Sequence, residues 1–335
     1  MFDSAQINLL DPVVLFFVLG AVAALLRSNL EVPPPIAKFL TLYLLMALGL
    51  KGGASIAEGG LPVEGMLAIL AAVIMALVVP AYAFAILSRK SDPFDSAAVA
   101  ATYGSVSAVT FITAQQFLVS KGVSVGGYMT AALVVMETPA IIMALLLAAI
   151  ARKRLATDTG QPDPSDDQGV KPLSMLEVLH EALTYGGHLL LIGSLLIGYV
   201  AAPTGMSQML PFTADLFKGM LAFFLLEMGL LVGRQIQSGV KIDRGLLAFA
   251  FLAPPTNAAL ALLVAMLFGL QLGDAVLLAV LSASASYIVV PAIVRYAVPE
   301  ARPGVYFTMS LALTFPFNIL LGIPLYYAAA EILWS

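Results

Sequence analysis

The chain has 335 residues, of which 61% are hydrophobic and only 11% are charged. This composition excludes a water-soluble globular domain and indicates a polytopic helical membrane protein. The net charge of -4 provides no basic patch for nucleic acid, and the absence of cysteine excludes disulfides and thiolate metal sites.

Ten apolar stretches are expected to cross the membrane as helices. The first has no basic residues before it, so it is predicted to be a retained span rather than a cleaved signal. The predicted spans lie near residues 13–30, 36–51, 65–87, 95–118, 128–151, 187–202, 211–233, 245–270, 274–297 and 304–332.

A polar segment rich in Asp, Pro and Gly separates the fifth span from the sixth and is predicted to be a mobile linker. The predicted organisation is a five-span unit over 1–151, a linker over 152–186 and a second five-span unit over 187–335. No nucleotide-binding motif is recognisable in the linker.

The two halves resemble each other at offsets of 177 to 180 residues, which indicates an internal repeat. Since each copy holds an odd number of spans, the second must enter the membrane from the opposite side, and the halves are expected to be inverted repeats. The aligned pairs are Gly49 with Gly229, Gly65 with Gly245, Asp95 with Asp274, and Pro139 with Pro316.

The distribution of basic residues predicts the topology. With the N-terminus outside, only Lys51, Lys121 and Lys218 of the 16 Lys and Arg residues fall on the outer side. Cytoplasmic loops are enriched in Lys and Arg. Both termini are therefore expected outside, with the linker in the cytoplasm.

The ninth span contains "LSASASYIVVP", in which Ser282, Ser284 and Ser286 alternate. Residues two apart on an α-helix point about 200° away from each other, so an extended break explains the pattern better than one helical face. The aligned residues 103–107 in the fourth span repeat it. We predict that the fourth and ninth helices are broken and cross at the membrane midplane, although small residues also line ordinary helix contacts.

Such a crossing offers two kinds of ligand. Half-helix N-termini carry partial positive charge and free N–H groups, which suit a small anion. Unwound carbonyls and hydroxyls suit a desolvated Na⁺. Neither requires a lysine or arginine at the membrane centre, where it would be costly.

Glu137 lies near the middle of the fifth span, two residues before Pro139. An intramembrane carboxylate can ligate a cation, carry a proton, or stay protonated and hydrogen-bonded to a neighbouring helix. Asp95 and Asp274 begin the two broken spans, where helix capping or pairing with the helix dipole accounts for them. Both histidines lie beside the linker and no two mid-span aspartates are paired, so an intramembrane protease is not expected.

Four motifs in the order "YGSVSAVT", "VMETPAI", "SASASYIVVPAIVR" and "LTFPFNILLGIPLY" resemble those of sodium-dependent bicarbonate transporters of the SbtA type, as a divergent member. The resemblance implies core and gate domains and alternating access within a bacterial plasma membrane. It further implies Na⁺-driven bicarbonate uptake, a homotrimer and a PII-like cytoplasmic regulator.

The resemblance also implies the site. In the family an acidic residue directly follows the serine run, whereas Tyr287 stands there in this chain, and Glu137 replaces an Asp. There are two alternatives to Na⁺-driven bicarbonate uptake. The protein could transport another small oxyanion or carboxylate without Na⁺ coupling, or it could be a passive anion channel. The expected substrate-binding residues are Gly104, Ser105, Ser107, Thr110, Ser284, Ser286 and Tyr287, and the Na⁺ candidates are Ser107, Thr110, Glu137 and Ser286.

Overall fold

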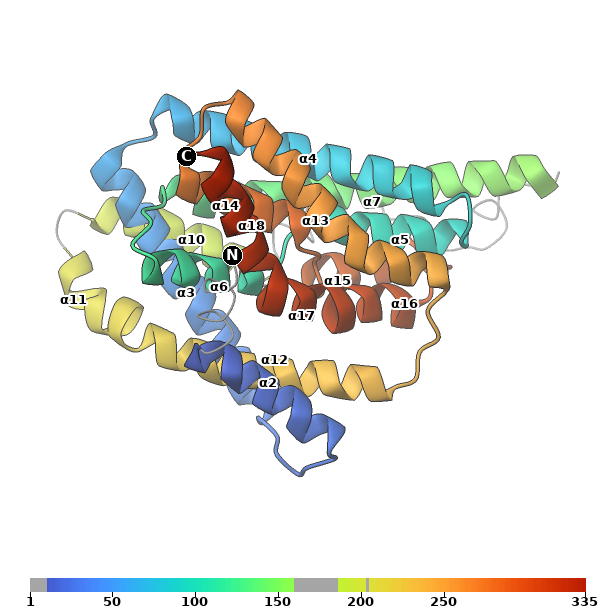
Figure 1. Cartoon of the computed structure of the whole chain (residues 1–335), viewed down its shortest axis with the longest axis horizontal. Helices are drawn as coiled ribbons and strands as arrows, with labels where there is room; N and C mark the ends of the chain where they lie inside the picture. Colours follow the sequence, from blue (N-terminus) through green and yellow to red (C-terminus); the bar gives the residue numbers. More distant parts are fainter. Residues whose placement is uncertain (1–10, 160–185, 203–204) are drawn as a thin grey trace.

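A computed structural model describes residues 11–159, 186–202 and 205–335, and all regular structure in these residues is helical (Figure 1). The expectation of an all-α membrane protein is thereby confirmed. The helices are α2 (Pro12–Leu25), α3 (Pro34–Gly59), α4 (Val63–Leu87), α5 (Pro93–Gly104), α6 (Ala108–Ser120), α7 (Tyr128–Thr159), α10 (Gly186–Ala201), α11 (Met206–Leu210), η1 (Pro211–Asp215), α12 (Phe217–Gln237), α13 (Arg244–Leu267), α14 (Leu272–Ala283), α15 (Val289–Ala297), α16 (Pro303–Phe307), η2 (Thr308–Thr314), α17 (Phe315–Phe317), η3 (Asn318–Gly322) and α18 (Ile323–Leu333).

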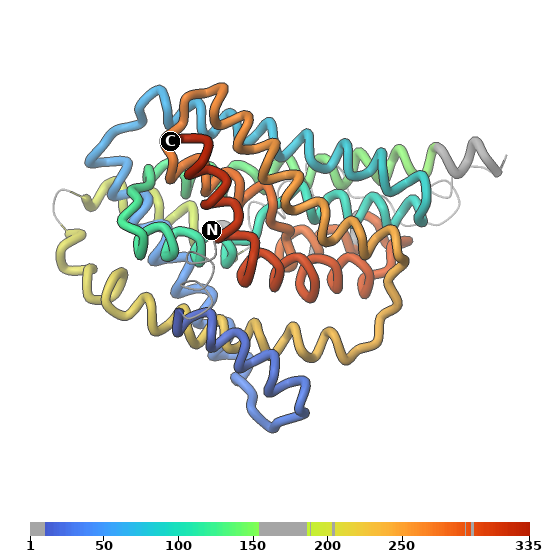
Figure 2. The backbone as a smooth tube through the Cα atoms, viewed as in Figure 1, coloured from blue at the N-terminus to red at the C-terminus, as the bar shows by residue number. Residues whose placement is uncertain are grey.

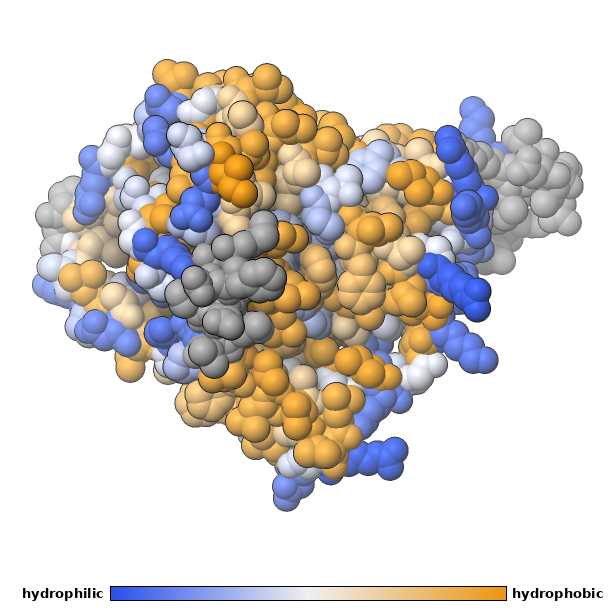
Figure 3. All heavy atoms as spheres, in the orientation of Figure 1, coloured by the Kyte–Doolittle hydropathy of each residue, from blue (hydrophilic) through white to orange (hydrophobic). Residues whose placement is uncertain are grey.

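In the described residues, 7 helical segments are long and apolar enough to cross a membrane, and three shorter apolar helices are Pro12–Leu25, Leu189–Ala201 and Leu272–Ala283. Each of these segments overlaps one predicted span, and several extend beyond its predicted ends. That each predicted span crosses once stays a prediction. Figure 3 shows a broad apolar belt with hydrophilic residues gathered toward the ends of the molecule. α7 continues to Thr159, past its predicted end at 151. Most of the predicted mobile linker, residues 160–185, lies outside the described residues.

The helices form two groups. α2, α3, α10 and α12 pack chiefly on one another and are called the side bundle, while α4 to α7 and α13 to α18 form the main bundle. In Figure 1, α2 and α12 lie together beneath the main bundle. A large core of apolar side chains continues through both bundles.

Glycines bring the helices of the side bundle into backbone contact. A Cβ atom on Gly53 of α3 would lie 1.9 Å from the carbonyl oxygen of Leu195 in α10, and one on Gly198 would lie 2.2 Å from that of Leu50. Gly49 likewise meets Leu191, one turn before Leu195, so residue numbers rise together along the two helices and the helices run parallel. α2 and α12 pack in the same parallel manner through Gly229. Small residues permit this approach between membrane helices.

The two predicted helix breaks are present (Figure 2). α5 ends at Gly104 and α6 begins at Ala108, while α14 ends at Ala283 and α15 begins at Val289. The backbone at Ser105 and Ser284, which cap the carboxyl ends of α5 and α14, is extended. Ser284 and Ser286 therefore lie in non-helical backbone, as predicted, whereas Ser282 lies in the last turn of α14.

Each broken span is fastened at its start by an aspartate in the first helical turn. Asp95 accepts hydrogen bonds from the backbone N (2.7 Å) and Nε (2.8 Å) of Arg302, just before α16. Asp274 accepts one from the backbone N of Gly126 (2.7 Å) and one from the hydroxyl of Tyr128, at the start of α7. Both aspartates thus tie a broken span to the helix that begins the last span of the other half.

We expect Gly198→Ala to destabilise the protein by about 1–3 kcal/mol, because the added methyl group overlaps the backbone of α3. Gly193→Ala on the same helix is the control, since its Cβ meets no atom within 4 Å. Thermal unfolding of the purified protein in detergent measures both. Equal unfolding midpoints for the two variants would contradict the parallel backbone contact.

Candidate functional site

The two breaks supply hydrogen-bonding partners to each other. The backbone N–H of Ser286 donates to the carbonyl oxygen of Thr102 (2.8 Å), and that of Ser107 donates to Oγ of Ser284 (2.9 Å). Thr102 lies in the last turn of α5, where carbonyl groups lack a partner within the helix. The crossing therefore satisfies backbone groups that would be costly to leave unpaired in an apolar surrounding.

The amino end of α6 faces the site. Ser107 is its N-cap, and its Oγ accepts hydrogen bonds from the backbone N (3.2 Å) and Oγ1 (2.9 Å) of Thr110. The first N–H groups of a helix have no acceptor within the helix, and they carry the positive end of the helix dipole. At α6 these first two residues are Ala108 and Val109, and both line the cavity described next.

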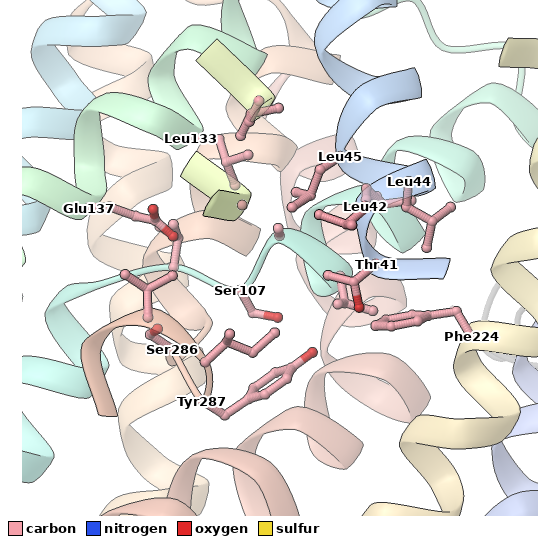
Figure 4. A pocket seen from close by; sticks show the side chains of 18 of the residues that line it. Thr41, Leu42, Leu44, Leu45, Ser107, Leu133, Glu137, Phe224, Ser286 and Tyr287 are labelled. Carbon is pink, nitrogen blue, oxygen red and sulfur yellow. The ribbon is translucent and has the colours of Figure 1, made fainter. Parts of the chain in front are cut away.

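A cavity of about 390 Å³ lies between the main bundle and the side bundle (Figure 4). Of the Lys, Arg, Asp and Glu side chains in the described residues, only those of Lys38 and Glu137 line it. The exposed lining residues are Lys38, Gly186 and Ile288, so the cavity reaches the surface beside the end of the linker. Its walls are formed chiefly by apolar side chains, namely Leu42, Leu44, Leu45, Val106, Ile112, Leu133, Leu191, Phe224, Ile288 and Val289.

Four of the predicted site residues line this cavity: Ser107, Glu137, Ser286 and Tyr287. Figure 4 shows them on one side of the cavity, with Thr41 and Phe224 of the side bundle on the other. All four side chains are buried. Two serines, a carboxyl group and a phenol that the sequence singled out therefore line one cavity.

Tyr287 joins the two bundles. Its hydroxyl donates to Sδ of Met228 on α12 (3.5 Å) and lies beside the Ser107 side chain. Its ring packs edge-on against Phe315, with centroids 5.2 Å apart. The residue thus contacts the side bundle, the amino end of α6 and the last span together.

The other predicted substrate-binding residues lie behind the cavity wall. A Cβ atom on Gly104 would lie 2.6 Å from Cγ of Pro80, so close packing explains the glycine. Ser284 and Thr110 hold the crossing and the amino end of α6 through their hydrogen bonds. Oγ of Ser105 is buried and has no hydrogen-bond partner among the described residues.

The sequence did not predict a layer of polar side chains that the last span places against the crossing. Asn318 donates from Nδ2 to the carbonyl oxygen of Ala283, the last residue of α14 (2.9 Å), and accepts from the Tyr326 hydroxyl (2.8 Å). The hydroxyls of Tyr103 and Thr314 lie 2.5 Å apart. Wide π-helical turns carry Thr314 and Asn318, a geometry frequent at functional sites. The polar Thr and Asn within "LTFPFNIL" are the sequence signal that could have identified this layer.

The oxygen atoms available to a cation are mostly neutral. In the described part of the chain, no group of three His, Cys, Asp or Glu side chains is placed to hold a metal ion. The predicted Na⁺ ligands are three hydroxyls and one carboxylate, which are hard oxygen donors suited to Na⁺ rather than to a transition metal. Two of them, Ser107 and Thr110, already contact each other.

A family model described as the Na⁺-dependent bicarbonate transporter superfamily matches residues 12–331. No curated protein matched the chain. The matched range contains both helix breaks and every residue that lines the cavity.

We expect Ser284→Ala to lower the free energy of unfolding by about 1–3 kcal/mol, because the buried N–H of Ser107 loses its acceptor. Ser105→Ala is the matched control and is expected to be neutral, since its hydroxyl has no partner among the described residues. Thermal unfolding measures both variants. A larger loss for Ser105→Ala than for Ser284→Ala would contradict this account of the crossing.

Proposed function

Since the chain belongs to the Na⁺-dependent bicarbonate transporter superfamily, we propose that it couples bicarbonate uptake to Na⁺ by alternating access. One observation carries the proposal: a single cavity joins the amino end of α6 to the space between two helix bundles. The family is one of transporters, in agreement with the expectation that the chain is not an enzyme.

The anion is held by backbone rather than by a buried cation. The N–H groups of Ala108 and Val109 lie at the positive end of α6, where a negatively charged oxygen is stabilised. The hydroxyls of Ser107, Ser286 and Tyr287 offer further hydrogen bonds. Bicarbonate, with three oxygens and one charge, matches several neutral donors better than it matches one lysine.

Na⁺ binds beside the anion in this proposal. The hydroxyls of Ser107, Thr110 and Ser286 supply neutral oxygens, and Glu137 supplies the carboxylate. Placing Na⁺ next to a carboxylate and an anion offsets the cost of removing each charge from water. Binding of one ion therefore favours binding of the other, which is the requirement for coupled transport.

Movement of one bundle against the other provides alternating access. The cavity reaches the surface at Lys38 and Gly186, which supports a state open on that side. The side bundle is held together by backbone contacts at Gly53, Gly198 and Gly229, which favours its motion as one body. Tyr287 is the cavity residue whose hydrogen bond with Met228 would break and reform during that motion.

We further propose that the two halves are inverted repeats whose broken helices cross at the membrane midplane. Two observations support this: the anchors at Asp95 and Asp274 are exchanged between the halves, and α3 and α10 pack in parallel. The proposed setting is a bacterial inner membrane with both termini outside. A homotrimer and a PII-like cytoplasmic regulator remain part of the proposal through the family.

A second candidate cargo follows from the cavity walls. Most lining residues are Leu, Val, Ile or Phe, and such walls suit the alkyl group of a short-chain carboxylate better than they suit bicarbonate. Its carboxylate would use the same amino end of α6. Inhibition of bicarbonate uptake by acetate or propionate, compared with formate, distinguishes the two cargoes.

We expect radiolabelled bicarbonate uptake into proteoliposomes to fall by about tenfold when Na⁺ is replaced by choline. The reason is the mutual stabilisation of cation and anion in one cavity. Ser286→Ala should raise the KM for bicarbonate, whereas Ser105→Ala, outside the cavity lining, should leave it unchanged. Equal uptake in Na⁺ and in choline would refute Na⁺ coupling. An unchanged KM in Ser286→Ala would refute the proposed binding site.

We expect Glu137→Gln to raise the Na⁺ concentration for half-maximal uptake at least about fivefold, because it removes a full charge beside the proposed cation. Glu227→Gln is the control, since Glu227 on α12 is also buried but does not line the cavity. The measurement is Na⁺ titration of initial uptake rates. Parallel shifts in the two variants would show that the effect is not local to the cavity.

A further inference from the structure

Lys38 occupies the open end of the cavity. It lies near the amino end of α3, is exposed, and lines the cavity together with Gly186 and Gly187, which have no side chains to cover it. No ion pair joins Lys38 to any residue in the described part of the chain. An unpaired ammonium group therefore stands where an anion passes between the cavity and the surrounding water.

The charges along the cavity are ordered. Lys38 lies at the mouth, and the positive end of α6 lies at Ala108 and Val109 further in. Thr41, one turn beyond Lys38 on α3, also lines the cavity. A positive charge at the mouth of a cavity raises the local concentration of anions there.

The repeat provides a second, independent observation. The offset of 180 residues that aligns Gly49 with Gly229 also aligns Lys38 with Lys218, and these lie on the equivalent helices α3 and α12. Lys218 is paired with Asp11, at 3.2 Å between Nζ and Oδ2. The lysine at the open mouth is unpaired among the described residues, and its counterpart in the other half is neutralised.

We propose that Lys38 is the anion-capture residue of this cavity: its ammonium group holds a small monovalent oxyanion between the linker-side water and the amino end of α6. The proposal rests on the transport function proposed above and adds a residue to it. The other role open to an exposed lysine at the end of a membrane helix is contact with lipid headgroups.

The absence of cysteine from the chain permits a direct test. Lys38→Cys is reconstituted into proteoliposomes and treated with a methanethiosulfonate reagent carrying either a trimethylammonium or a sulfonate group. Exchange of radiolabelled bicarbonate at a concentration below the KM is measured before and after treatment. Lys241→Cys, at an exposed position in the loop before α13 and outside the cavity, is the control.

We expect Lys38→Cys to slow exchange about fivefold, the cationic reagent to restore it, and the anionic reagent to slow it about fivefold further. Lys241→Cys should exchange at the original rate throughout. Equal effects of the two reagents, or exchange by Lys38→Cys at the original rate, would overturn the proposal in favour of a headgroup contact or simple obstruction.

A labelling measurement separates this proposal from the proposed transport function. Bicarbonate, formate, acetate and nitrate are each tested for slowing the reaction of Thr41→Cys, a cavity position that leaves Lys38 in place, with the anionic reagent, and Lys241→Cys is the reference. The measurement is repeated with Lys38→Gln added, and only slowing that Lys38→Gln abolishes is counted. Slowing by one of these anions supports anion capture even if the unmodified protein exchanges no bicarbonate, a result that would refute only the cargo. Slowing by none of them overturns the role of Lys38, whatever the transport result.

Discussion

Two interrupted helices can persist inside an apolar bundle only when their freed backbone groups find partners. Here the backbone N–H of Ser286 bonds to Thr102, that of Ser107 bonds to the side chain of Ser284, and Asn318 bonds to the last carbonyl of α14. Removing one break would leave unpaired groups at the other. The crossing is therefore cooperative, and the position of α6 depends on the position of α14.

This dependence explains where the cavity lies. The hydrogen bonds at the crossing fix the amino end of α6, and the side chains of Ser107 and Tyr287 point toward the side bundle (Figure 4). The side bundle closes the opposite wall through Thr41 and Phe224. The helices of the side bundle touch one another through glycine backbones, separately from the crossing. The two walls of the cavity therefore depend on two different kinds of packing.

The sequence predicted the breaks closely because alternating serines within apolar runs have no helical explanation. It could not separate hydroxyls that face the cavity from those that build the crossing, since Ser284 and Ser286 share one pattern and differ only in tertiary contacts. It located Asp95 and Asp274 at helix starts, yet their partners Arg302 and Tyr128 depend on long-range packing. Backbone donors such as Ala108 cannot be recognised from residue type.

The likeness of the two halves does not extend to the chemistry of the cavity. Ser107 and Ser286 occupy aligned positions, 179 residues apart, and both line it. Glu137 aligns with Thr314, but Glu137 lines the cavity whereas Thr314 bonds to Tyr103 and to the carbonyl oxygen of Ala250. The cavity-lining serine is thus present in both halves, whereas the carboxylate that lines the cavity comes from the first half alone.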